Sequence, residues 1–493
     1  MELHEAFVGK NLHDISVPAA VVDRAVVRRN CLQMLQACDA LDVDFRPHVK
    51  THKTIEVARL QVGEPWRHTV KLVVSTLAEA EHLLPFLLEC QDHGKSVNVL
   101  YGLPIPPSTV RRLAEFGKRL LPGSLSVDTG YHRAGVTPSS AEFLNLVTRI
   151  LDGGKKSMSI EFGGLYSHAG HSYGGSSASQ AMNLLIEEIE SLRKASEIVK
   201  NLHPKIAHKQ LTLSVGATPT ATSVQNLLEL SDGPQAPGVK QSDALKDCIH
   251  QAKANHDRVE LHAGVYPFLD MQQLATQASP SASQPSTGPG LSFGDVAFTI
   301  LTEVASLYSE REQPEALIAA GSLALGREPC KSYSGWGIVS NWGFDSTIPT
   351  GRSGWQVGRI SQEHGILTHE SSKHGDTREL CVGQKVRMFP NHACVAGAAF
   401  DYYLVVDSSL PEKRHDEILE VWKEDQVMVS VRTADRRDEE QSRAPLLATP
   451  TLESIVSSFP STSHPPDTMS SQHNIQNSDQ ADHNIAAVAQ EKN

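Results

Sequence analysis

Two basic side chains stand where loops should follow strands, and both could take part in chemistry. Lys50 lies in the segment RPHVKTHKT, residues 46–54, directly after an apolar run. A lysine held partly out of water at a strand end can lose its proton and form a Schiff base. Arg133 lies in VDTGYHRAGV, residues 127–136, in a loop bracketed by two glycines. Each segment taken alone is more typical of an ordinary surface loop.

A third segment gathers polar rings. GLYSHAGHSY, residues 164–173, contains Tyr166, His168 and Tyr173 in one short stretch after a strand-like run. Tyrosine and histidine rings at the rim of a sheet suit a planar ligand, and simple packing within a loop is the alternative. The segment therefore indicates a ligand site only if the neighbouring segments converge on it.

Two segments rich in small residues could bind an anion. In SVGATPT, residues 214–220, Gly216 and Thr218 offer a backbone N–H and a hydroxyl group at a turn before a helix. Such donors favour phosphate. In HAGVYPFLD, residues 262–270, the amides near Gly264 could complete the same cradle. No lysine of the P-loop type accompanies them, so a nucleoside triphosphate is not implied. A capped helix start is the alternative.

The segment FPNHACVAG, residues 389–397, contains a possible metal pair. His392 and Cys394 are two residues apart, so on a strand both side chains would point to one face. Imidazole and thiolate are ligands that zinc prefers. A closed structural site would need two more nearby ligands, which no adjacent motif supplies. The pair therefore predicts an open zinc site, although a spacing this short also arises by accident.

The elements that must position these residues read as alternating strands and helices. Short apolar runs without strict alternation are typical of strands buried on both faces. Eight such repeats over about 250 residues match the size of a TIM-type (β/α)8 barrel, with a doubly wound open sheet as the alternative. The runs span residues 17–22, 44–49, 71–76, 97–101, 124–128, 158–166, 211–216 and 259–263.

The pattern changes along the chain and predicts its domains. We expect an α/β barrel over residues 17–274, with an insertion near 232–256. Residues 275–290 contain neither charge nor aromatic ring and predict a linker or loop insertion. Short strand-like runs broken by Gly, Pro and Asn then predict an all-β domain over 291–430. The serine-rich residues 451–493 include one aromatic residue and predict a disordered tail.

Composition narrows the class of protein. The 493 residues include 57 acidic and 45 basic side chains, a net charge of −12, which disfavours a general nucleic-acid binder. No apolar run reaches the roughly 18 residues of a membrane span, and the N-terminus lacks the features of a signal peptide. Seven scattered cysteines do not form a disulfide framework. We expect a cytoplasmic protein that interacts with neither nucleic acid nor membrane.

The order of these segments resembles a known family. The chain is similar to the fold-type III pyridoxal-phosphate enzymes, the alanine-racemase-like group, and within them to the zinc-dependent eukaryotic D-serine dehydratases. RPHVKTHKT, GLYSHAGHSY and PNHAC carry the resemblance most specifically, whereas DTGYHRAG and SVGATPT are shared more widely. It covers about residues 10–430. In that family the lysine strand is the first of the barrel, which makes the run at 17–22 the doubtful one.

The resemblance also implies roles for individual residues. Lys50 would hold pyridoxal phosphate, and His392 and Cys394 would bind zinc. The phosphate and the rest of the cofactor or substrate would be held by Thr218, Gly216, Gly264, Arg133, Tyr166, His168 and Tyr173. The family often has Asn where this chain has Val265, so only a backbone contact could survive at that position.

The implied reaction is loss of water from D-serine. The lysine would remove the Cα proton, the cofactor would accept the electrons, and zinc would assist the departing hydroxide. The resulting aminoacrylate hydrolyses to pyruvate and ammonia. A D-threonine aldolase-like lyase and a 3-hydroxyaspartate dehydratase remain open. A non-enzymatic pyridoxal-phosphate-binding protein would lack the β domain. The resemblance also implies a homodimer.

Overall fold

The computed structural model describes most of the first 423 residues. Clustering of contacts separates two compact units, Met1–Arg432 and Thr433–Asn493. The second unit contains no described residue, so the tail predicted over 451–493 lies outside the described part. Residues 127–131 of the arginine segment do so as well. The described residues are 3–63, 69–117, 123–126, 132–156, 162–229, 239–281, 283, 290–370 and 377–423.

Seven of the eight predicted runs form parallel strands in the N-terminal part. Five of them pair in the order β2-β8-β7-β6-β5, and β3 pairs with β4. A parallel bridge between His48 and Val73 links the end of β2 to β3. The loops that follow the strands therefore lie at one edge, where α/β proteins bind their ligands. The strands are β2 (Asp44–Pro47), β3 (Thr69–Val74), β4 (Ser96–Tyr101), β5 (Gly123–Ser126), β6 (Phe162–Tyr166), β7 (Leu211–Val215) and β8 (Asp257–Ala263).

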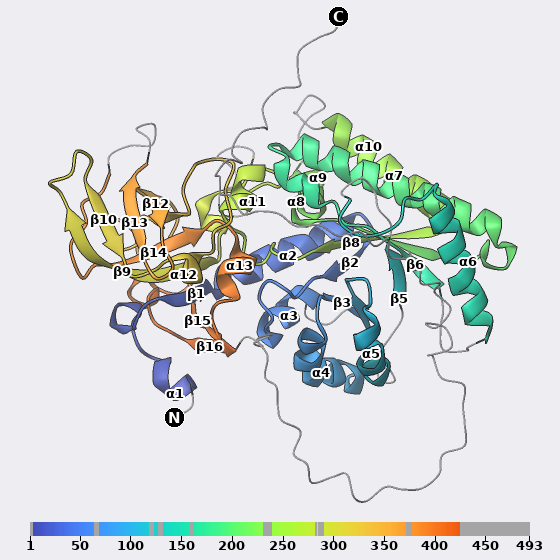
Figure 1. Cartoon of the computed structure of the whole chain (residues 1–493), viewed down its shortest axis with the longest axis horizontal. Helices are drawn as coiled ribbons and strands as arrows, with labels where there is room; N and C mark the ends of the chain where they lie inside the picture. The colour runs from blue at the N-terminus through green and yellow to red at the C-terminus, as the bar shows by residue number, and fades with distance from the viewer. Residues whose placement is uncertain are drawn as a thin grey trace, which may run out of the picture. The chain divides into compact units, whose positions relative to one another are not determined.

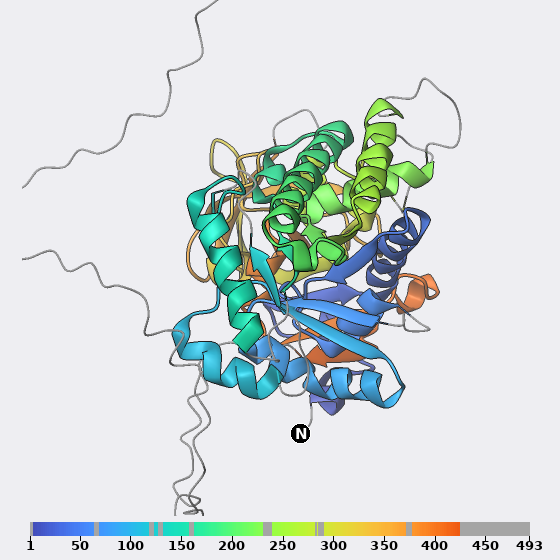
Figure 2. The same ribbon diagram turned by 90° about the vertical axis from the view of Figure 1, so that its right-hand side faces the viewer.

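Helices alternate with these strands and lie outside them (Figures 1 and 2). Several begin at a side chain that accepts a hydrogen bond from the first turn, namely Asp23, Thr54, Thr76 and Ser177. The helices are α2 (Arg24–Ala40), α3 (Ile55–Val62), α4 (Leu77–Asp92), α5 (Val110–Gly117), α6 (Ala141–Lys156), α7 (Ala178–Leu202), α8 (Thr218–Thr222), α9 (Asn226–Glu229), α10 (Val239–Ala254) and α11 (Met271–Thr276). No described helix is long and apolar enough to cross a membrane.

The C-terminal part is built on a nine-stranded sheet with the order β10-β13-β12-β11-β14-β9-β1-β15-β16. Short helices α12 (Ser322–Leu325) and α13 (Ala393–Gly397) accompany it, and α1 (Leu3–Phe7) lies against β16. Its strands are β1 (Ala19–Asp23), β9 (Phe298–Tyr308), β10 (Glu315–Ile318), β11 (Gly337–Ser340), β12 (Arg352–Ile360), β13 (Gly365–His369), β14 (Lys385–Pro390), β15 (Tyr402–Val406) and β16 (Glu420–Lys423).

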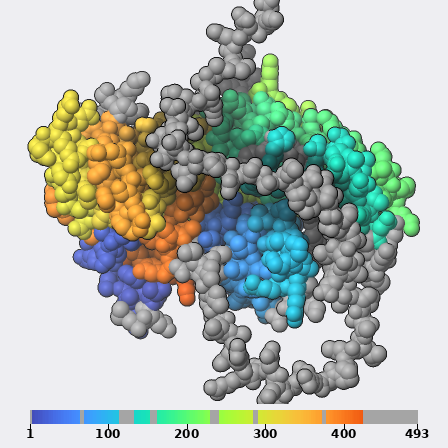
Figure 3. Space-filling model, in the orientation of Figure 1, coloured from blue at the N-terminus to red at the C-terminus, as the bar shows by residue number. Residues whose placement is uncertain are grey.

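The run at residues 17–22 does not begin the N-terminal set of strands, so that part of the predicted domain 17–274 is wrong. Its residues form β1, which pairs antiparallel with β9 and parallel with β15. Figure 3 shows the N-terminal residues, in dark blue, beside the orange C-terminal strands. All five residues of β1 are buried. A fully buried apolar strand has the same sequence pattern in either sheet, which explains the error.

The segment predicted as a linker, residues 275–290, begins inside the protein. Ala275 and Thr276 end α11, and Ala278 and Ser281 are buried. The Ser281 hydroxyl donates a hydrogen bond of 2.6 Å to the Asp295 carboxylate. Residues 282 and 284–289 lie outside the described part. The described portion is therefore packed structure that joins α11 to the C-terminal sheet.

One apolar core runs through both parts of the first unit. It includes Leu213 and Leu261 from the parallel strands and Ile300 and Met388 from the nine-stranded sheet. These side chains are almost completely buried. Because the two parts share this core, the loops after the parallel strands are held against the segment that follows β14.

Candidate active site

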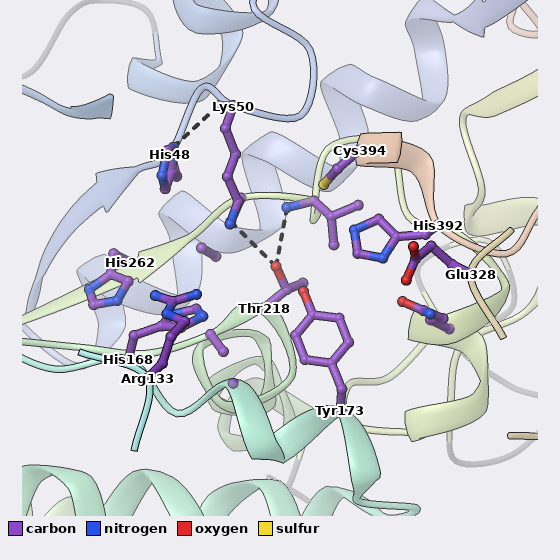
Figure 4. A pocket seen from close by; sticks show the side chains of 16 residues that line it. His48, Lys50, Arg133, His168, Tyr173, Thr218, His262, Glu328, His392 and Cys394 are labelled. Carbon is purple, nitrogen blue, oxygen red and sulfur yellow. Dashed lines mark hydrogen bonds between the residues drawn. The ribbon is translucent and has the colours of Figure 1, made fainter. Parts of the chain in front are cut away.

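A cavity of about 300 Å³ lies where the two parts meet, a volume suited to a small cofactor. Figure 4 shows Lys50, Thr218 and Tyr173 facing it from the N-terminal part and His392, Cys394 and Glu328 from the C-terminal part. It is lined by His48, Lys50, Arg133, His168, Gly170, Tyr173, Ala217, Thr218, His262, Ala263, Gly264, Val265, Gln272, Glu328, His392 and Cys394. Nine of the eleven residues predicted for the site are among these.

Lys50 enters the cavity from the turn after β2, as the sequence predicts. The backbone N–H of Lys50 donates to Nδ1 of His48 over 3.2 Å. Nε2 of His48 is 3.0 Å from the Ser75 hydroxyl, in the turn after β3. The lysine is half-buried. Contacts from two strand ends therefore fix the backbone from which its side chain reaches inward.

The two small-residue turns meet at Thr218, the first residue of α8. Its Oγ1 accepts hydrogen bonds from the backbone N–H groups of Gly264, at 3.3 Å, and Val265, at 3.2 Å. A Cβ atom at Gly264 would lie 3.6 Å from the Lys50 side chain, so glycine keeps this wall of the cavity open. Because both amides donate to the Thr218 oxygen, the hydroxyl can turn its own hydrogen toward an anion such as phosphate.

Tyr166 and Gly216 lie behind the cavity wall rather than on it. The Tyr166 ring stacks on His262 with centroids 4.5 Å apart. The Gly216 carbonyl is 2.8 Å from Nδ1 of His168. Gly216 has φ of +135°, and a Cβ there would come within 2.5 Å of the His262 carbonyl. Both residues thus orient the histidines that do line the cavity.

The histidines of the wall are held neutral. Burial lowers the pKa of His262 to about 3, and burial also lowers the pKa values of His48 and His168 well below their usual range. Nearby Lys50 adds to each shift. Neutral rings of this kind offer a flat, uncharged surface to a ligand. Arg133 also lines the cavity, from an exposed position.

His392 and Cys394 both line the cavity, but the predicted strand is wrong. The strand β14 ends at Pro390, and His392 is the residue before α13, which contains Cys394. The sequence predicted no separate turn between Pro390 and His392. Proximity of the two side chains therefore comes from a helix start rather than from strand alternation.

The pair formed by His392 and Cys394 contacts the turn that carries Lys50 directly. The Cys394 sulfur is 3.1 Å from Oγ1 of Thr51, the neighbour of Lys50. Burial alone would raise the pKa of Cys394, but a hydrogen bond and the charge of His392 outweigh it and lower the pKa. Burial alone would lower the pKa of His392, but a hydrogen bond and the charge of Cys394 outweigh it and raise the pKa to about 9. No cluster of three or more metal-ligating side chains occurs among the described residues.

Asp270 links the segment that contains His392 and Cys394 to the N-terminal part. One carboxylate oxygen accepts from the N–H of Gln273 at 2.9 Å, at the start of α11. The other accepts from the N–H of Ala393 at 2.8 Å, between His392 and Cys394. Asp270 is completely buried. This one side chain therefore fixes the segment that carries both predicted metal ligands.

Four polar residues of the cavity were not predicted from the sequence. His48 and His262 stand two positions before Lys50 and Gly264, so strand alternation could have placed them on the same side. Gln272 lies in the first turn of α11 and Glu328 in the turn after α12, but no pattern in the chain connects them with the other segments. They are found only when the two parts are brought together.

Comparisons with known proteins give a consistent family. Residues 22–231 match the alanine racemase N-terminal domain, and residues 297–406 match a putative serine dehydratase domain. A D-serine dehydratase from Schizosaccharomyces pombe is 34% identical over 85% of this chain and 94% of its own length. One from Saccharomyces cerevisiae is 31% identical over 82% of this chain and 95% of its own.

A solved structure shows the same fold. The D-threo-3-hydroxyaspartate dehydratase from Delftia sp. HT23 superposes with a TM-score of 0.62 at 24% identity, over 84% of this chain and 99% of that one. The described part thus has an alanine-racemase-like N-terminal domain followed by a strand-rich C-terminal domain. With identities above 30% along most of its length, the chain belongs to the D-serine dehydratase family.

Proposed function

We propose that this chain is a lyase that removes water from D-serine and gives pyruvate and ammonia. The observation that carries the proposal is one cavity in which Lys50 faces a histidine–cysteine pair. A base and a metal site on either side of a small molecule suit β-elimination of a hydroxyl group. The names of the two yeast relatives support the same substrate.

The residues of the cavity fit pyridoxal phosphate. Lys50 would bind its aldehyde carbon, and the Thr218 hydroxyl, positioned by the amides of Gly264 and Val265, would hold its phosphate. The neutral rings of His168 and His262 offer a surface for the flat pyridine ring. When bound, the cofactor would supply an electron sink for the charge that develops on Cα.

The donor atoms of His392 and Cys394 fit zinc. A thiolate and an imidazole are two of its preferred ligands, and two ligands leave positions for water or substrate. The lowered pKa of Cys394 favours the thiolate that a metal requires. When bound, zinc would act as a Lewis acid on the β-hydroxyl group.

The chain's own residues then have defined tasks. The Lys50 amine takes the proton from Cα, because its side chain enters the cavity beside the phosphate cradle. The β-hydroxyl departs with the electrons of its bond to carbon on the side of His392 and Cys394. Arg133 and Tyr173 line the remaining wall and orient the substrate. The product aminoacrylate hydrolyses to pyruvate and ammonia.

Three broader features belong to the same proposal. We propose that the seven parallel strands close as a TIM-type barrel, an arrangement supported by the His48–Val73 bridge and by contact between β4 and β5. We propose domain limits near residues 24–274 and 291–430, with β1 as an N-terminal strand of the second domain. A homodimer and a cytoplasmic location complete the proposal.

A substrate panel tests the function. The full chain, supplied with pyridoxal phosphate and Zn²⁺, is assayed with D-serine, L-serine, D-threonine and D-threo-3-hydroxyaspartate, and both keto acid and aldehyde are measured. We expect pyruvate from D-serine and none from L-serine. Aldehyde from D-threonine as the main product would replace the proposal with an aldolase, and absence of any product from D-serine would overturn it.

A further inference from the structure

Thr51 follows Lys50 directly, and the proposed reaction gives its hydroxyl group no task. The residue is 1% exposed. Its Oγ1 lies 3.1 Å from the sulfur of Cys394, within hydrogen-bond distance. On the other side of this oxygen, a Cβ atom at Gly264 would lie 3.5 Å away. The hydroxyl is therefore enclosed in protein, between the turn that follows β8 and the segment that carries Cys394.

The direction of the hydrogen bond between Thr51 and Cys394 follows from the task proposed for the sulfur. A cysteine that binds a metal ion does so as a thiolate. A thiolate has no proton to donate, so the Thr51 hydroxyl must be the donor and the sulfur the acceptor. Hydrogen bonds to a charged acceptor are stronger than those between neutral groups.

A hydrogen bond to a metal-binding sulfur alters how the sulfur acts on the metal ion. The donated proton draws electron density toward itself, and less of that density then reaches the metal. Groups that contact the ligands of a metal in this way tune its properties without touching it. A metal ion that receives less density from its ligands polarises a bound oxygen more strongly. In the proposed reaction that oxygen is the β-hydroxyl group of the substrate.

The two segments that meet at this contact are also held by other hydrogen bonds. In the turn that carries Lys50, the backbone N–H of Lys53 donates to the Val49 carbonyl over 2.8 Å. The segment that carries Cys394 is held by the buried carboxylate of Asp270. Removal of the Thr51 hydroxyl alone should therefore leave the lysine and the cysteine in place.

We propose that Thr51 is a positioning residue of the metal site, whose hydroxyl donates a hydrogen bond to the Cys394 sulfur and thereby keeps the bound metal ion a strong Lewis acid. The inference rests on the proposed function and adds a residue that acts through Cys394. Its effect should be confined to substrates whose leaving group needs the metal. Hydroxide is such a leaving group, whereas chloride leaves as a stable anion without a Lewis acid.

Three variants of the full chain separate the hydroxyl group from the shape of the side chain. Thr51→Val replaces the hydroxyl by a methyl group, Thr51→Ser keeps it, and Thr302→Val removes a buried hydroxyl from β9 as a control. Each protein is loaded with pyridoxal phosphate and with either Zn²⁺ or Co²⁺. We measure kcat for D-serine and for β-chloro-D-alanine, bound metal by elemental analysis, and the sulfur-to-cobalt charge-transfer band in the difference between the Co²⁺ and Zn²⁺ spectra.

We expect kcat for D-serine to fall about tenfold in Thr51→Val, the lower end of the effect of such indirect metal contacts. The charge-transfer band should move to longer wavelength, because a sulfur that has lost its hydrogen bond holds its electrons less tightly. Bound metal and kcat for β-chloro-D-alanine should stay at the wild-type values. Thr51→Ser and Thr302→Val should match the wild type in every measurement.

An unmoved charge-transfer band in Thr51→Val, or an equal fall in kcat for both substrates, would overturn the inference. Loss of bound metal from this variant would also overturn it, since the hydroxyl would then serve to hold a ligand in place. A wild-type protein without the band would refute the metal site and the inference with it. Pyruvate release from D-serine by the wild type is recorded separately, because the band reports the contact in the absence of any substrate.

Discussion

At the scale of the residue, the cavity depends on side chains whose neighbours set their charge. Lys50 and Cys394 are 344 positions apart by their numbers, yet Thr51 contacts the Cys394 sulfur at 3.1 Å. The Thr218 hydroxyl joins two turns that are also distant in sequence. Substitution of any one of these side chains should therefore have an effect that depends on its specific contact.

Cys394→Ala should remove one of the two proposed zinc ligands. We expect bound zinc to fall below one equivalent and pyruvate release to fall at least about 100-fold, because loss of even indirect metal contacts costs about 10–100-fold in affinity or activity. The visible absorption of bound pyridoxal phosphate should remain. The matched control is Cys381→Ala, which changes an exposed free cysteine. Full activity in Cys394→Ala, or wild-type activity unaffected by a chelator, would remove zinc from the account.

Glu188 of α7 should give the folded state an unusual pH dependence. Its carboxylate accepts a hydrogen bond of 2.8 Å from Ser167, next to His168. Burial raises the pKa of Glu188 from 4.5 to about 7. Between these values the folded state holds a proton that the unfolded state has released. The contribution of Glu188 to the free energy of unfolding therefore falls as pH rises from 4.5 to 7.

Glu188→Gln should remove this dependence. Relative to the wild type, the variant should gain up to about 3 kcal/mol in free energy of unfolding between pH 4.5 and pH 8, measured by urea denaturation. Glu187→Gln, on the exposed side of the same helix, should show no such gain. A pH-independent difference between wild type and Glu188→Gln would show that Glu188 is not protonated in the fold.

At the scale of the element, the sequence predicted strands well and their partners poorly. The runs 211–216 and 259–263 correspond to β7 and β8. They were predictable because each is apolar and is followed by small residues, which mark the strand end. The run 17–22 has the same composition and joined the other sheet. The sequence pattern of a strand indicates that the strand is buried. The sheet that β1 joins depends instead on its pairing with β9 and β15, which lie far along the chain.

In the predicted site, too, local features were predictable from the sequence and long-range contacts were not. Lys50, Thr218 and Gly264 follow strands, so their edge of the sheet was predictable. His392 and Cys394 were recognised as a pair, but α13 follows β14 too closely for a sequence pattern to separate them. Glu328 could not have been predicted, since only the packing of the two parts brings its turn to the cavity.

Asp270 should act as a positioning residue between elements. In Asp270→Asn the side-chain oxygen can still cap α11, but the amide group would face the N–H of Ala393, which needs an acceptor. We expect zinc affinity to fall about 10–100-fold while cofactor absorption is kept. Asp23→Asn, at the start of α2, should alter stability without altering zinc affinity. Equal zinc affinity in Asp270→Asn and wild type would contradict this role.

At the scale of the whole molecule, the first unit is tied together by its N-terminal residues. β1 lies between β9 and β15 in the nine-stranded sheet, and α2 follows it into the N-terminal part. The net charge of −12 does not predict this connection. The shared core means that neither part is expected to keep the cavity alone.

Deletion of residues 1–23 should therefore disrupt the entire first unit. Without β1, strands β9 and β15 lose their common partner and expose backbone groups. We expect the shortened chain to aggregate in size-exclusion chromatography and to lose near-ultraviolet circular dichroism. A chain ending at Arg432, which removes only the second unit, serves as the control. It should stay monodisperse and keep its near-ultraviolet circular dichroism. A monodisperse, folded product of the N-terminal deletion would contradict the shared-core description.

The rate at which pyruvate and ammonia are released from D-serine tests the proposed function most directly. It is measured for the full chain with pyridoxal phosphate and Zn²⁺ present, and for Lys50→Ala under the same conditions. We expect equal amounts of the two products from the wild type and a fall of about 10²–10⁴-fold or more in the variant. No release by the wild type, or undiminished release by Lys50→Ala, would contradict the proposed function.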